Sequence, residues 1–158
     1  MLVDTHAHIN MMVKKNFDTI MTQDEIDNAR SIIENAHASG VTRIINVGTS
    51  VPESSNCILL AQNYESVFAV VGIHPNDLST DWKTQMNDIR KFLANQRENK
   101  IVGIGETGMD KHYPDFDLQL QESGFRYQIE LALKYNLGLV VHTRDAAEET
   151  LRILELYK

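Results

Sequence analysis

Residues 101–110 read IVGIGETGMD, an apolar run that leads directly into a carboxylate, and this stretch decides the fold class. An apolar run without alternating polar positions is typical of a strand that is buried on both faces, and such strands belong to parallel sheets covered by helices. We therefore expect a strand over Ile101–Gly105 that ends at Glu106. A glutamate that serves only the dipole of a helix would normally lie after the turn, so Glu106 is a candidate functional residue.

Runs of the same kind recur on both sides of this stretch, as VTRIINV, VFAVVGI and LGLVVH, and longer amphipathic segments separate them. Strands are expected at residues 2–6, 41–47, 67–73, 101–105 and 137–142, and helices at residues 24–39, 52–64, 82–99, 116–135 and 145–157. This alternation predicts the α/β class in a single domain, residues 1–158. The polar residues at the strand ends favour a parallel (β/α) TIM-barrel type with about five of its eight units present. A complete five-stranded flavodoxin-like sheet is the alternative on the pattern alone.

Net charge and cysteine content limit the kind of protein. The 158 residues carry a formal net charge of −7, which argues against indiscriminate binding to phosphate backbones. Any nucleic-acid chemistry must therefore draw its attraction from bound cations or from a local basic patch. The single cysteine, Cys57, fits a reducing cytoplasm. No run approaches the ~18 apolar residues of a membrane span and the start MLVDTHAHIN has no secretion signal, so we expect a cytoplasmic protein without a membrane partner.

Two histidines close the first expected strand, in the stretch DTHAH at residues 4–8. His6 and His8 are two positions apart, so on an extended chain their imidazoles point to the same side, about 7 Å apart at the backbone. Two neutral imidazoles at that spacing can chelate one divalent cation, and we expect Asp4 to orient them as a hydrogen-bond acceptor. An isolated pair of this kind is weak, because two loop histidines also meet by chance. His37 and His112 fall on a helix and in a loop, and we expect both to be structural or solvent-facing.

Further histidines follow the third and fifth strands, at His74 and His142. Because the carboxyl ends of parallel strands share one edge of a sheet, we expect His6, His8, Glu106 and His142 to lie together there. Imidazoles combined with a carboxylate suit zinc, manganese or magnesium-like hydrolytic ions. The two oxygens of a glutamate can also bridge two cations about 3.5–4 Å apart, as two-metal hydrolases require.

Four motifs follow one another along the whole chain: DTHAH at residues 4–8, GIHP at 72–75, GETGMD at 105–110 and VHTRDA at 141–146. In this order and at these intervals they resemble the TatD family of metal-dependent deoxyribonucleases, which belongs to the amidohydrolase-like TIM-barrel superfamily. Each motif alone is weak, but four in register are highly specific. The resemblance implies a metal-dependent hydrolase that cleaves DNA phosphodiester bonds, in the manner of a 3′–5′ exonuclease, with a water activated by two metal ions.

The resemblance also implies a role for each motif residue. One metal would bind His6 and His8, Glu106 would be the bridging and catalytic carboxylate, and His142 would bind the second metal. His74 and Arg144 would line the substrate side. The implied cofactors are two divalent metal ions, whether zinc, magnesium or manganese, and the implied partner is DNA or another nucleotide phosphodiester.

Two other functions fit the same residues. The superfamily also hydrolyses amides and esters with similar ligands, so an amide or ester hydrolase is the alternative enzyme. The family chain normally continues for about three more units, which supply another histidine and the strand-end aspartate that partners the attacking water, because a full barrel takes ~250 residues. A truncated chain that binds metal without turnover is the non-enzymatic alternative. We also expect the open sheet to be covered, either by the remaining barrel fragment or by self-association with a second copy.

Overall fold

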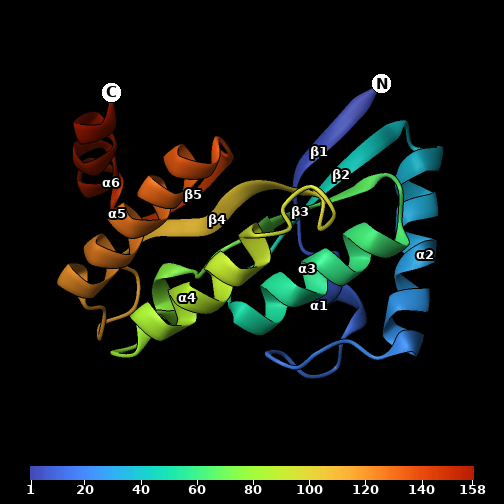
Figure 1. Cartoon of the computed structure of the whole chain (residues 1–158), viewed down its shortest axis with the longest axis horizontal. Helices are drawn as coiled ribbons and strands as arrows, with labels where there is room; N and C mark the ends of the chain where they lie inside the picture. Colours follow the sequence, from blue (N-terminus) through green and yellow to red (C-terminus); the bar gives the residue numbers. More distant parts are fainter.

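The chain forms one curved parallel sheet with helices packed along its outer face (Figure 1). The computed structural model describes residues 1–158. The strands are β1 (Leu2–Ala7), β2 (Val41–Val47), β3 (Val67–Val71), β4 (Ile101–Asp110) and β5 (Gly138–Arg144). All neighbouring strands are parallel and lie in the order β1-β2-β3-β4-β5. A flavodoxin-like sheet would place β1 inside the sheet, so that alternative is wrong and the half-barrel prediction is confirmed.

Six α-helices and two 3₁₀ turns lie between the strands or follow the last one. They are α1 (Ile9–Val13), α2 (Gln23–Ala38), α3 (Val51–Asn63), η1 (Pro75–Asp77), α4 (Trp82–Leu93), α5 (Leu118–Tyr135), α6 (Ala147–Leu154) and η2 (Glu155–Tyr157). Three of the longer helices begin at a side-chain cap: Thr22 and Glu25 form a capping box before α2, Ser50 caps α3, and Asp117 caps α5. No helix is both long enough and apolar enough to cross a bilayer.

The main core lies between the sheet and the helices α2 to α5. The inner face of the sheet is covered only at its centre. Val70, on the central strand β3, is buried there, whereas Ile104 of β4 belongs to the main core on the outer face. Ile45 and Val140 are half-buried, and Val3 on the edge strand β1 is 48% exposed. The two edge strands therefore leave apolar surface in water on the side where a closed barrel would have its opposite wall.

Both strands that carry predicted metal ligands are irregular near those ligands. β1 has one extra residue relative to β2 within Asp4–Ala7, and β4 has one extra residue relative to β5 within Ile104–Thr107. β4 also continues to Asp110, so Glu106 lies inside the strand and not at the end of a shorter strand as predicted. An extra residue bends a strand locally and changes the direction of its side chains. These bulges therefore set the directions in which His6 and Glu106 point.

A buried polar network ties the segment after β1 to α3. Glu53 of α3 accepts a hydrogen bond at Oε1 from Nζ of Lys14 at 2.6 Å, and both side chains are almost fully buried. Asn46 of β2 accepts a hydrogen bond from the main-chain N–H of Ile9 at 2.6 Å. Because these buried partners cannot leave the core without losing their hydrogen bonds, they fix the course of the chain directly after His8.

Candidate metal centre

The polar residues of the strand ends meet at the carboxyl edge of the sheet in two neighbouring clusters. We call His6, His8 and Glu106 the first cluster, and His74, Asp110 and His142 the second cluster. Within each cluster one ligand atom from every residue lies within 4.8 Å of the others. The two clusters are in contact, because a ring nitrogen of His142 lies 3.0 Å from a carboxylate oxygen of Glu106.

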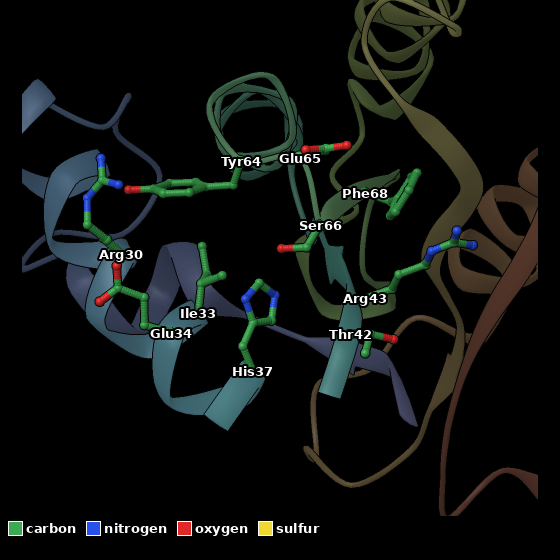
Figure 2. Close-up of a pocket in the computed structure, with 10 residues that line it drawn as sticks. All are labelled: Arg30, Ile33, Glu34, His37, Thr42, Arg43, Tyr64, Glu65, Ser66 and Phe68. Atoms are coloured by element: carbon green, nitrogen blue, oxygen red, sulfur yellow. The ribbon is translucent and has the colours of Figure 1, made fainter. Parts of the chain in front are cut away.

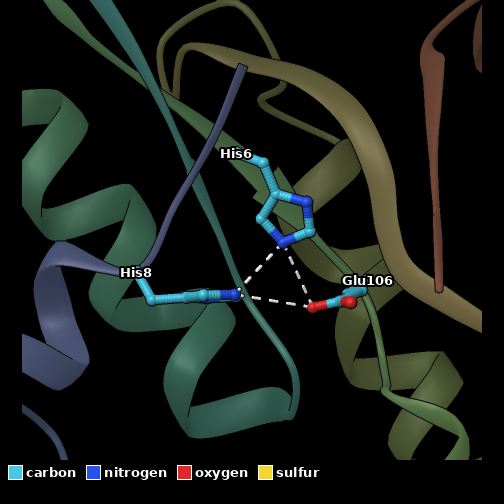
Figure 3. A group of neighbouring side chains, drawn as sticks. All are labelled: His6, His8 and Glu106. Atoms are coloured by element: carbon cyan, nitrogen blue, oxygen red, sulfur yellow. Dashed lines mark hydrogen bonds and ion pairs between the residues drawn. The ribbon is translucent and has the colours of Figure 1, made fainter. Parts of the chain in front are cut away.

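The first cluster is a triangle of two imidazole nitrogens and one carboxylate oxygen (Figure 3). Nε2 of His6 lies 3.1 Å from Nε2 of His8 and 3.3 Å from Oε2 of Glu106. The third edge, from Nε2 of His8 to Oε2 of Glu106, is 3.5 Å. Tetrahedral ligands with bonds of about 2.0–2.1 Å to zinc lie about 3.3–3.4 Å from one another, so the triangle has the size of three such ligands.

The imidazole of His8 is held in the orientation that a metal ligand needs. Its Nδ1 lies 2.8 Å from the carbonyl oxygen of Val47, which can only accept, so Nδ1 carries the proton and Nε2 keeps its lone pair. That lone pair faces the other two atoms of the triangle. Asp4 was expected to orient the histidines, but its Oδ1 accepts from the main-chain N–H of His6 at 3.0 Å. The carbonyl of the neighbouring strand takes the predicted role because β1 lies directly against β2.

Glu106 faces both clusters, each with a different oxygen. Oε2 belongs to the triangle with His6 and His8, while Oε1 lies 3.0 Å from Nδ1 of His142. Burial by itself would raise the pKa of this carboxyl, but the contacts with His8 and the other nearby imidazoles outweigh burial and lower the pKa to about 2. Glu106 is therefore a carboxylate at neutral pH, with one oxygen for each cluster.

The second cluster centres on His142, whose ring lies between two carboxylates. Its Nε2 lies 3.0 Å from Oδ2 of Asp110, and its Nδ1 lies 3.0 Å from Oε1 of Glu106. A neutral imidazole has only one N–H, so one of these two contacts brings lone pairs together unless a second proton or a cation lies there. This donor set, together with the triangle, is suited to divalent cations such as zinc or manganese.

Asp110 was not singled out from the sequence, although it ends the GETGMD motif. It is 1% exposed, and its Oδ1 accepts from the main-chain N–H of His112 at 2.8 Å. Burial raises the pKa of Asp110, but hydrogen bonds with His112, Asn76 and His142 outweigh burial, so the pKa lies below its ordinary value. The signal that could have found it is strand alternation: Asp110 lies four positions after Glu106, so on one continuous strand the two carboxylates share a face.

His74 lies beside His142, with a distance of 4.3 Å between the ring centroids. Its Nδ1 accepts a hydrogen bond from the main-chain N–H of Asn76 at 3.2 Å, so the neutral ring carries its proton on Nε2. Burial and the neighbouring His142 lower the pKa of His74 to about 4, so the ring is neutral at pH 7. In this form His74 offers an N–H donor, in contrast to the lone pair that His8 offers.

Arg144 lies at the end of β5, outside both clusters. Its side chain is exposed, and its guanidinium carbon lies 5.8 Å from the centre of the Tyr113 ring. The two histidines expected to be structural or solvent-facing are both exposed, His37 on α2 and His112 in the loop after β4. The structure thus brings five of the six predicted site residues into the clusters and leaves Arg144 at their margin.

A pocket of about 560 Å³ lies at the opposite end of the sheet (Figure 2). Its walls come from the end of α2, the start of β2 and the start of β3, and they include His37, Arg43 and Phe68. Neither cluster contributes a residue to this pocket. Both clusters therefore lie at the carboxyl edge, which is where active sites of parallel α/β sheets are found.

Comparisons with known proteins relate the chain to a single family. The family model described as "TatD related DNase" matches residues 3–158. The chain is 34% identical over 155 residues to the uncharacterized metal-dependent hydrolase YabD of Bacillus subtilis (strain 168), a match that covers 98% of this chain and 55% of YabD. It is also 34% identical over 124 residues to the 3′-5′ ssDNA/RNA exonuclease TatD of Salmonella typhimurium, with 78% of this chain and 46% of that protein covered.

Solved structures show the same fold. The crystal structure of YJJV, a TatD homologue from Escherichia coli K12, superposes with a TM-score of 0.83 at 24% identity and covers 99% of this chain and 56% of that one. A TatD family hydrolase from Entamoeba histolytica gives a TM-score of 0.77 at 22% identity, covering 98% and 54%. The chain thus spans about half the length of the relatives that it matches.

Proposed function

Because the chain belongs to the TatD-related DNase family, we propose that it supplies the metal-binding part of a two-metal phosphodiesterase that removes nucleotides from a strand end of DNA in the 3′-to-5′ direction. The observation that carries this proposal is the position of Glu106 between the two clusters. One of its oxygens faces His6 and His8, and the other faces His142. Such a carboxylate can share two cations and fix their separation.

The residues of this chain would hold two divalent ions in neighbouring places. His6 and His8 would hold one ion, His142 with Asp110 the other, and Glu106 both. When bound, the two ions would lower the pKa of a water molecule and offset the charge of a phosphate. The formal net charge of −7 makes that offset necessary for any nucleic-acid substrate.

The remaining site residues would bind the substrate. His74 presents an N–H donor beside the second cluster, and a neutral donor there can hydrogen-bond a phosphate oxygen at neutral pH. Arg144, at the margin of the clusters, would bind a phosphate further along the DNA strand, because a guanidinium group can donate two parallel hydrogen bonds to phosphate oxygens.

The test is replacement of Glu106 by alanine in the purified protein, with metal content and nucleotide release as the two measurements. Loss of the shared ligand should lower both the bound metal and the hydrolysis of single-stranded DNA, the latter by at least about 100-fold. The matched control is Glu98→Ala, which removes an exposed glutamate far from the clusters. Near-native metal content and DNA hydrolysis in Glu106→Ala would show that Glu106 is not the bridge.

The same assay separates the alternative functions. If small amides or esters are hydrolysed while DNA is not cleaved, the alternative hydrolase replaces the nuclease proposal. Metal binding without turnover of either substrate would identify a metal-binding chain that does not act as an enzyme alone.

A further inference from the structure

A second pocket lies directly beside the second cluster, between the loops that follow β3 and β4. It has a volume of about 430 Å³, within the range of about 300–1,000 Å³ that is common for small-molecule sites. We call it the side pocket. Its walls come from residues 75–78 on one side and from residues 113–121 on the other.

The side pocket shares contacts with the candidate metal centre. Asn76, which lines the pocket, donates from Nδ2 to Oδ2 of Asp110 at 2.9 Å, and the same oxygen lies 3.0 Å from Nε2 of His142. Gln121, also in the wall, accepts at 2.8 Å from the main-chain N–H of Asp110 and donates at 2.9 Å to its carbonyl. Asn76 and Gln121 are therefore both walls of the side pocket and supports of Asp110, so the pocket lies only one residue away from the second cluster.

The lining of the side pocket includes two exposed aromatic rings. Tyr113 is 50% exposed and Phe116 is 39% exposed, although rings of this size are normally covered in a folded protein. The guanidinium carbon of Arg144 lies 5.8 Å from the centre of the Tyr113 ring. Exposed aromatic rings beside an arginine are the groups on which single-stranded nucleic acids stack their bases.

The rest of the wall combines apolar side chains with two exposed acidic ones. Leu78 lies directly on α5, since a Cβ added at Gly124 would be 2.5 Å from its Cδ1. Asp115 and Asp117 add negative charge and would repel a phosphate, whereas a carboxylate accepts hydrogen bonds from the amino groups of a base. The charge of the pocket therefore suits a nucleobase and not the sugar-phosphate backbone.

We propose that the side pocket binds the nucleobase adjoining the scissile phosphate, with Tyr113 and Phe116 as the stacking rings. This inference rests on the proposed nuclease function and adds to it a site for one base. In this proposal the rings of Tyr113 and Phe116 bind the substrate and take no part in the chemical step. Their loss should raise KM for DNA and leave kcat nearly unchanged.

The experiment measures binding of a short single-stranded DNA that carries a fluorescent adenine analogue at its terminal positions. The parent protein should quench the analogue at one position, as stacking does. Tyr113→Ala and Phe116→Ala should each weaken binding about tenfold and abolish that quenching, while Tyr113→Phe, which keeps the ring, should restore both. The matched control is Phe68→Ala, which removes an aromatic ring from the pocket at the opposite end of the sheet.

A second probe lacks the base at the quenched position. The parent should bind this abasic strand about tenfold more weakly than the intact strand, and Tyr113→Ala should add little further loss, because both changes remove the same contact. Native affinity and quenching in both alanine variants would overturn the side-pocket assignment while leaving the nuclease proposal standing. Absence of DNA binding by the parent protein would overturn both.

Discussion

The Oδ2 atom of Asp110 lies 3.0 Å from Nε2 of His142, so the final residue of β4 directly contacts the histidine of β5. The opposite ring nitrogen, Nδ1, lies 3.0 Å from Glu106. The orientation of this imidazole is therefore set from both sides by carboxylates of a single strand. Asp110 makes this contact although it is almost fully buried.

We predict that Asp110→Asn lowers metal affinity and DNA hydrolysis together, by about 10- to 100-fold. The amide keeps the size of the side chain but removes the negative charge that fixes the His142 ring. Metal titration by calorimetry and nucleotide release are the measurements. Asp88→Asn, which removes an exposed carboxylate on α4, is the control. Unchanged metal affinity in Asp110→Asn would mean that His142 is oriented by other groups.

We predict that Glu53→Ala destabilises the protein by about 3–5 kcal/mol, because it leaves the buried Lys14 ammonium without its partner. A Lys14→Met/Glu53→Leu double variant, which removes both charges, should be distinctly more stable than the single variant. The free energy of unfolding in urea is the measurement. Equal losses in the single and double variants would show that the charge pair is not what the single variant disrupts.

The same pair predicts a dependence of stability on pH. Burial raises the pKa of Glu53, but hydrogen bonds from Lys14, Asn10 and Asn56 outweigh it, so folding lowers this pKa. The stabilisation is therefore complete above the ordinary glutamate pKa of about 4.3 and is lost as the pH falls through the lowered value. Thermal melts across acidic pH should show a smaller loss in Glu53→Gln than in the parent. Parallel curves for the two proteins would assign the acid sensitivity to other carboxylates.

We predict that Gly108→Ala destabilises the fold by about 1–3 kcal/mol or more and weakens metal binding. Gly108 has a φ of +147°, and a Cβ there would lie only 2.0 Å from the carbonyl oxygen of His142. The two strands would have to separate, and His142 would move with β5. Gly138→Ala is the matched control, because its Cβ would meet only an ordinary contact at 3.4 Å. Similar melting temperatures for the two variants would contradict the prediction.

We predict that the 158-residue chain alone self-associates. Its edge strands β1 and β5 have unpaired backbone, and Leu2 and Val3 are 59% and 48% exposed. Sedimentation velocity should detect dimers or larger species, and Val3→Lys should reduce them by placing a charge on that surface. A monomer that melts cooperatively at all concentrations would show that the open sheet needs no cover.

The sequence predicted the strands well because their apolar runs are long and rich in Val and Ile. It did not predict that β4 continues through GETGMD to Asp110, because glycines disfavour strands on local grounds, and it is the pairing with β5 that extends this strand. The helix α1 was also missed, since Ile9–Val13 is too short to show helical periodicity. Its position depends on the buried Glu53 network, which joins residues about 40 positions apart.

The same limit applies to the candidate site. His6, His8, Glu106 and His142 could be chosen from the sequence, because each follows an apolar run. The hydrogen-bond partner of His8 could not be predicted, because it is the main-chain carbonyl of Val47 and every residue type has such a carbonyl. The side pocket could not be predicted either, because its two walls come from segments that are distant in the sequence and meet only in the fold.

The hydrogen bond from His8 to the carbonyl of Val47 has a consequence for how the site tolerates mutation. Every amino acid offers a main-chain carbonyl, so exchange of the side chain at position 47 leaves this hydrogen bond available. His142, in contrast, depends on the side chain of Asp110, which a single substitution removes. Random mutation should therefore disturb the orientation of His142 in the second cluster more readily than that of His8 in the first.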